Sequence, residues 1–213
     1  MVLTAAMFAL WQTPAVVPLK ILIVFFHEIS HAVATFATGG EVVSLSISPN
    51  QGGMVQGRGG NRFITLSAGY LGSLLMGVGL LIAATRTKAD RAIMAGCGIV
   101  TLVIAGLYVR EFFALGFTVG AGVGMLLMAR FLGHTSNDLV LRVIGLGSMI
   151  YVPYDIFSDT IARSSLRSDA RMLAQEFGGT TMLWGGVWLI ISIAVIGCCL
   201  KYGLGRSSNL RLR

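Results

Sequence analysis

The sequence predicts an all-α membrane protein that crosses the bilayer about six times and has a small β-hairpin or sheet after its first span. Two properties of the composition predict this class: 55% of the 213 residues are hydrophobic and only 12% are charged. A soluble domain usually carries about 25% charged residues. Runs of about 20 apolar residues are long enough to cross a bilayer as a helix. We therefore expect an integral, multi-pass protein whose residues 1–213 form a single membrane-embedded domain.

The charge balance does not indicate a nucleic-acid partner. The chain has a formal net charge of +7, but its basic residues are scattered between apolar runs. Lys and Arg at the ends of membrane helices commonly contact lipid headgroups. We therefore expect the lipid bilayer, and no nucleic acid, to be the partner of these charges.

The first predicted span covers about residues 17–38. A shorter apolar segment, residues 2–11, precedes it and lacks the basic start and cleavage site of a signal peptide. We interpret this segment as a partial or re-entrant helix, with a seventh span as the alternative. Gly39 and Gly40 follow the first span, and glycine is common directly after a helix C-terminus.

The segment over about residues 41–62 has the pattern of a β-hairpin. Apolar and polar residues alternate from Glu41 to Pro49, and Asn50–Gly53 supplies residues typical of a turn. We expect this hairpin at the membrane edge, beside the first span. A polar segment, residues 163–180, precedes the last span, and a basic tail follows it. The five further spans are predicted over about residues 63–84, 92–108, 112–132, 139–161 and 181–200.

Three ionisable residues lie close together near the middle of the first span. His27 and His31 are four residues apart, so their imidazoles share one face of a helix and can hold one metal ion. Glu28 can reach a water molecule on that metal and act as a catalytic general base. A charged residue at the centre of a membrane helix costs roughly 2.5–3.5 kcal/mol. This cost favours a functional Zn²⁺ site over three unrelated polar residues.

A catalytic Zn²⁺ normally has three protein ligands and one open position, so a third ligand is expected. Asp155 and Asp159 lie four residues apart near the end of the span over residues 139–161. Two carboxylates on one apolar face resist ionisation unless a cation lies nearby. We predict Asp155, nearer the apolar centre, as the third metal ligand. Asp159 is predicted to orient a histidine or the water, with two alternatives: it is itself the third ligand, or it caps the helix end. Asp169, in the polar segment, is expected to be a structural or surface residue.

Several motifs together carry a resemblance to a known family. They are His27–His31, Arg58–Gly60, Ala68–Gly72, Tyr154–Asp159 and Ser168–Ala170. Over roughly residues 18–177, this combination resembles the site-2 protease superfamily of intramembrane zinc metallopeptidases, in particular its compact branch without PDZ-like or other regulatory domains. The resemblance implies a catalytic core of three spans that cleaves peptide bonds within or next to a transmembrane segment of a membrane-protein substrate. A regulatory membrane partner is an additional option.

One departure from this family leaves two other functions open. The better-known members carry Leu-Asp-Gly in the aspartate helix, where this chain has Tyr154-Asp155-Ile156. The first alternative is a non-catalytic membrane adaptor or chaperone that keeps the zinc site. Glu28 argues against it, because a structural site does not need an uncoordinated glutamate. The second alternative is a metal transporter, although the chain lacks the repeated halves that transporters often show.

Overall fold

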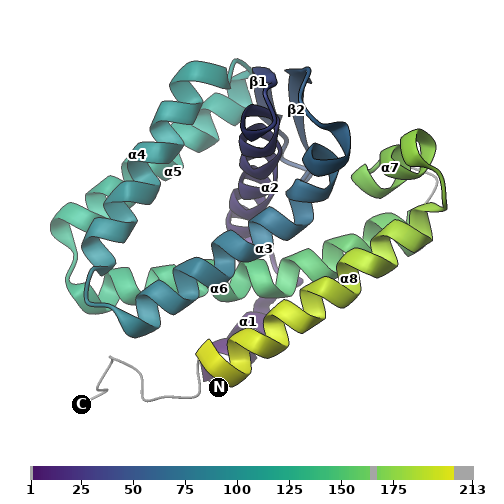
Figure 1. Ribbon diagram of the computed structural model, residues 1–213. Coiled ribbons are helices and arrows are strands. Elements are labelled where there is room, and N and C mark those ends of the chain that lie inside the picture. The colour runs from purple at the N-terminus through teal and green to yellow at the C-terminus, as the bar shows by residue number, and fades with distance from the viewer. Residues whose placement is uncertain (1, 164–166, 204–213) are drawn as a thin grey trace.

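Six helices of the computed structural model are long and apolar enough to cross a membrane (Figure 1). The structure describes residues 2–163 and 167–203, so most of the predicted basic tail lies outside the described residues. The fold class predicted from the sequence, an integral multi-pass helical protein, is confirmed. Its organisation as one domain over residues 1–213 stays a prediction. The six helices are α2 (Val17–Ala37), α3 (Arg62–Arg86), α4 (Asp90–Tyr108), α5 (Phe112–Phe131), α6 (His134–Phe157) and α8 (Thr181–Cys198).

The N-terminal apolar segment forms a short helix, α1 (Val2–Leu10), followed by a 3₁₀ turn (Pro14–Val16) that leads into α2. A helix of nine residues is about 13.5 Å long, and the hydrocarbon core is about 30 Å thick. The segment is therefore a partial helix and not a seventh span. Directly after α1, Trp11 is buried against Tyr151 of α6, with 6.2 Å between the ring centroids.

The predicted hairpin is also confirmed. Strands β1 (Glu41–Ile47) and β2 (Gly53–Arg58) pair antiparallel, and both strands contact α2. A register shift lies between Val42 and Ser44, so the buried residues of β1 do not alternate strictly. The hairpin lies at one end of α2 in Figure 1.

Helix α3 packs between α2 and α6 and forms the centre of the membrane bundle. A Cβ atom on Gly77 of α3 would meet the side chain of Ser148 and the carbonyl of Gly145, both on α6. Small residues at these positions therefore let the two helices approach closely, as is common in membranes. Helices α4 and α5 form a hairpin that leans away from this centre (Figure 1).

Helix α6 begins at His134, whereas the sequence placed the start of this span near residue 139. The first turn is stabilised by Asn137, whose side-chain amide donates to three carbonyls at the end of α5 and in the following loop. At its other end α6 continues past Pro153 into a wide π-helical turn, Ser158–Ala162. Such turns are frequent at functional sites, and this turn carries Asp159.

The polar segment contains a helix that the sequence analysis did not predict, α7 (Asp169–Phe177). The Ser168 side chain caps its N-terminus by accepting a hydrogen bond from the backbone N–H of Arg171. An ion pair between Arg62 of α3 and Glu176 of α7 connects the two helices. Helix α7 lies at the same end of the molecule as the hairpin (Figure 1), and so Asp169 reaches the motif helix.

Candidate metal centre

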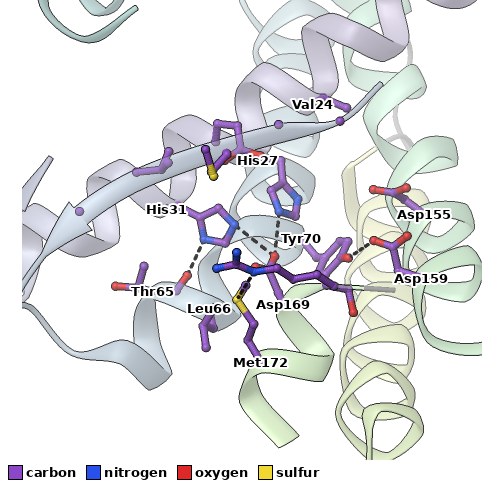
Figure 2. A pocket seen from close by; sticks show the side chains of 18 of the residues that line it. Val24, His27, His31, Thr65, Leu66, Tyr70, Asp155, Asp159, Asp169 and Met172 are labelled. Atoms are coloured by element: carbon purple, nitrogen blue, oxygen red, sulfur yellow. Dashed lines mark hydrogen bonds and ion pairs between the residues drawn. The ribbon is translucent and has the colours of Figure 1, made fainter. Parts of the chain in front are cut away.

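Three side chains converge where α2 and the start of α7 meet (Figure 2). Asp169 Oδ2 lies 2.9 Å from His27 Nε2 and 3.1 Å from His31 Nε2. One potential ligand atom from each residue lies within 4.8 Å of the other two. His31 and Asp169 are buried, and His27 is partly buried. This group offers two imidazoles and one carboxylate, as catalytic zinc sites with His₂-carboxylate ligation do.

The orientation of His31 is fixed by the next helix. Its Nδ1 atom lies 2.7 Å from the backbone carbonyl oxygen of Thr65, which can only accept a hydrogen bond. Nδ1 therefore carries the proton of the neutral ring, and Nε2 keeps its lone pair for a metal ion. Such a partner on the far side of a ligating histidine is the usual arrangement in metal sites.

The donor distances fit a zinc ion. Zinc bonds to histidine nitrogen and carboxylate oxygen are about 2.0–2.2 Å long, so two ligand atoms of a tetrahedral site lie roughly 3.3 Å apart. The separations of 2.9 and 3.1 Å between Asp169 Oδ2 and the two imidazole nitrogens are close to this value. The residues present therefore fit Zn²⁺.

The charge state of Asp169 also suits a metal ligand. Burial on its own raises the pKa of this carboxyl group. When no metal is bound, the positive charge of protonated His31 and hydrogen bonds from both histidines outweigh burial and hold the pKa of Asp169 well below its usual value. A bound metal ion would replace the protons on the two Nε2 atoms. Asp169 is thus a carboxylate at neutral pH, the form that binds a metal.

The backbone of α3 faces the two imidazoles at Gly69. A Cβ atom at this position would meet His27 Nε2 and would lie 2.6 Å from His31 Nε2. Only glycine leaves room here for both rings. The sequence analysis had included Gly69 in the resemblance without assigning it this role.

We expect Gly69→Ala to displace the imidazoles and lower zinc binding by more than half. Zinc per chain, measured by mass spectrometry on detergent-purified protein, checks this prediction. Gly79→Ala is the matched control, because nothing lies within 4 Å of a Cβ atom at Gly79 on the same helix. Zinc content equal to that of the wild type in Gly69→Ala would show that the rings do not need this space.

Glu28 lies beside the histidines in the same cavity, which has a volume of about 670 Å³. The residue is only 4% exposed. A Cβ atom on Gly53 of β2 would meet the Glu28 carboxylate, so the hairpin backbone packs directly against this side chain. In the described part of the chain, no hydrogen bond or ion pair occupies this carboxylate. It is free to take a proton from a molecule in the cavity.

Asp155 and Asp159 line this cavity, and in the described part of the chain neither forms a hydrogen bond or ion pair with His27 or His31. Figure 2 shows Asp155 on α6 and Asp159 on the π-helical turn that follows it, both to one side of the two imidazoles, whereas Asp169 lies beneath the rings. The structure thus brings Asp169 to His27 and His31, and among the described residues only these three form a group with metal-ligand spacing. Asp155 as the third ligand stays a prediction.

Asp159 holds a tyrosine instead of a histidine. It accepts a hydrogen bond of 2.6 Å from the Tyr70 hydroxyl and forms an ion pair of 2.7 Å with Arg163. The Tyr70 ring packs edge-on against the His27 ring, with 4.6 Å between the centroids. Asp159 is therefore linked to His27 through Tyr70, and its role in orienting a histidine or the water stays a prediction.

The sequence analysis missed the placement of Asp169. Of the two expected roles, structural or surface residue, the surface role is wrong, because Asp169 is only 8% exposed. A signal was present: Ser168 is a good helix cap, and Ala170, Leu173 and Phe177 have helical spacing. This pattern places Asp169 in the first turn of a helix with one apolar face, and such a helix must pack against the rest of the protein.

Comparison with known proteins identifies the family. The family model described as Peptidase M50B-like matches residues 1–199. Comparison with curated proteins gives no match. Comparison with solved structures gives none either.

Proposed function

This chain belongs to the Peptidase M50B-like family of membrane metallopeptidases of the site-2 protease type, and we propose that it hydrolyses peptide bonds in or near transmembrane segments of membrane proteins. In this proposal, His27, His31 and Asp169 hold Zn²⁺ and Glu28 is the general base. The convergence of the three donors beside Glu28, in one cavity, carries the proposal.

The residues around the cavity have separate roles in the proposed reaction. A bound Zn²⁺ would lower the pKa of a water molecule and polarise the scissile carbonyl. Glu28 accepts the proton of this water and returns it to the leaving amine. The Thr65 carbonyl keeps the His31 tautomer, and Gly69 leaves room for both imidazoles. Burial of Glu28 and Asp169 limits the access of bulk water.

The hairpin supplies a surface for the substrate backbone. Gly53, Met54, Val55 and Gly57 of β2 line the cavity, and β2 pairs with β1 along its other side. A transmembrane helix hides its carbonyls in internal hydrogen bonds, so it must unwind before attack. An unwound segment could then pair with β2 by strand addition. This places an extended substrate next to Glu28.

The proposal is tested by cleavage in proteoliposomes of a model substrate that has one span and a tag at each end. We expect two fragments, no cleavage after treatment with the zinc chelator 1,10-phenanthroline, and recovery of more than half of the activity when Zn²⁺ is restored. Cleavage that is insensitive to chelation would contradict a zinc mechanism. Zinc-loaded protein that binds substrates without cleaving them would instead support the adaptor alternative.

A further inference from the structure

Three arginine side chains line the cavity of the metal centre: Arg62, Arg163 and Arg167. Two of them are neutralised by carboxylates of the protein. Arg62 forms an ion pair of 3.0 Å with Glu176, and Arg163 forms one of 2.7 Å with Asp159. Arg167 is the exception.

The guanidinium group of Arg167 has no carboxylate partner among the described residues. Its Nε atom donates to the sulfur of Met172 at 3.4 Å, and a thioether is a weak acceptor. All nine Asp and Glu residues of the chain lie in the described part, and none is within ion-pair distance of Arg167. The four N–H donors of its terminal nitrogens are therefore available to a ligand.

A second guanidinium approaches the same sulfur atom. Arg62 Nη2 lies 3.7 Å from Met172 Sδ, on the same atom that Arg167 contacts. Two positive groups thus converge at one point of the cavity wall, while Glu176 offsets only one of them. Like charges brought together create a positive potential that attracts an anion. The side chain of Arg167 is exposed, so an anion can reach it.

This positive point lies next to the metal centre and at the edge of the candidate membrane spans, because Arg167 and Met172 lie outside them and Arg62 is the first residue of α3. Arg167 precedes the proposed ligand Asp169 by two residues, and Met172 follows Asp169 on α7. Figure 2 shows Met172 close to Asp169 at the edge of the cavity. A peptide held with its scissile bond at the metal centre would bring a flanking residue to this place. Because α7 is not one of the spans, that residue belongs to the end of a transmembrane segment.

We propose that Arg167 is a specificity-determining residue that binds a carboxylate of the substrate, supplied by an Asp or Glu side chain that flanks the scissile bond at the membrane boundary. Guanidinium pairs with carboxylate through two parallel hydrogen bonds, which gives geometric selectivity as well as affinity. This inference rests on the proposed peptidase function, because it assigns the charge of the substrate of that same site.

The test measures binding, so that it does not depend on turnover. Zinc-loaded, full-length Glu28→Gln protein in detergent is titrated with dye-labelled peptides of about 20 apolar residues. The peptides differ in the position of a single Asp, which is placed at the first, second or a later position after the apolar segment. A matched set has Asn in place of each Asp. We expect the best Asp peptide to bind about 5- to 10-fold more tightly than its Asn partner, as a charge-assisted hydrogen-bond pair would give.

Variants assign the preference to one side chain. Arg167→Gln is expected to reduce the preference to less than about twofold, and Arg167→Glu to favour a Lys peptide instead. Arg171→Gln is the control, because Arg171 is a nearby arginine on α7 and is not among the residues that line the cavity. Equal binding or no binding of the Asp and Asn peptides contradicts the inference. A preference that survives Arg167→Gln, or a loss of affinity shared by both peptides, contradicts it as well.

The cleavage assay keeps this inference separate from the proposed function. A wild-type protein that cleaves Asp and Asn substrates equally would contradict the role of Arg167 and leave the peptidase proposal in place. A protein that binds Asp peptides through Arg167 but never cleaves would contradict the peptidase proposal and leave the carboxylate-binding role of Arg167 in place.

Discussion

Asp169→Ala is expected to lose zinc, whereas Asp155→Ala is expected to keep it. Asp169 Oδ2 lies within 3.1 Å of both histidine nitrogens, whereas Asp155 forms an ion pair with neither and is not part of the group with metal-ligand spacing in the described residues. Removal of one ligand of three should weaken zinc binding by more than the roughly 10- to 100-fold that loss of an outer partner causes. Zinc per chain, measured by mass spectrometry on detergent-purified variants, checks the prediction, with His27→Ala as the reference for complete loss.

Two further variants make this result specific. Asp169→Asn keeps the size of the side chain and removes its charge, so it should also lose most of the zinc while α7 stays in place. Asp159→Ala is expected to keep near wild-type zinc, because Asp159 is linked to His27 only through Tyr70. Zinc lost with Asp155→Ala and retained with Asp169→Ala would restore the third ligand predicted from the sequence and overturn the proposed one.

The parts of the site that could be predicted from the sequence are those fixed within one helix. His27, Glu28 and His31 lie on one continuous helix, whose 3.6-residue repeat sets their relative positions. The helix itself follows from an apolar run of sufficient length. The neighbouring hairpin follows from alternation and turn residues, which are also local signals. No tertiary contact is needed for any of these predictions.

The third donor could not be found in this way, because Asp169 is 142 residues away from His27 in sequence. The prediction of Asp155 assumes that the third ligand lies in an apolar span. In the structure, Asp169 instead comes from α7, a helix that lies outside the candidate spans and packs next to the site. This helix packs against α8 and α3, and an ion pair between Arg62 and Glu176 joins it to α3. Those pairings are set by the fold and have no local signature.

The roles of small residues also depend on tertiary contacts that the sequence does not reveal. Ala68–Gly72 indicates close helix packing, and this is the role of Gly72, where a Cβ atom would meet the side chain of Ser30 on α2. Gly69, three residues earlier, faces two imidazoles instead. A glycine that packs and a glycine that makes room for a metal site have the same appearance in a sequence. Only the facing side chains distinguish them.

The second large effect is expected for Glu28→Gln, which should abolish cleavage and leave zinc bound. The amide has nearly the same shape as the carboxylate and fits against Gly53, but it cannot accept the proton of the attacking water. Loss of a general base typically lowers the rate about 10²- to 10⁴-fold. Zinc should remain near the wild-type level, because Glu28 is not one of the three converging donors.

Glu41→Gln is the matched control for this experiment, because it makes the same change at an exposed position on β1. Cleavage rate and zinc content are measured on the same preparations. Cleavage that persists in Glu28→Gln would show that another group activates the water. Loss of both zinc and cleavage would instead give Glu28 a structural part in the site. Loss of cleavage with zinc retained is the only outcome that separates proton transfer from metal binding. It would assign proton transfer to the buried Glu28 carboxylate and zinc binding to the two histidines and Asp169.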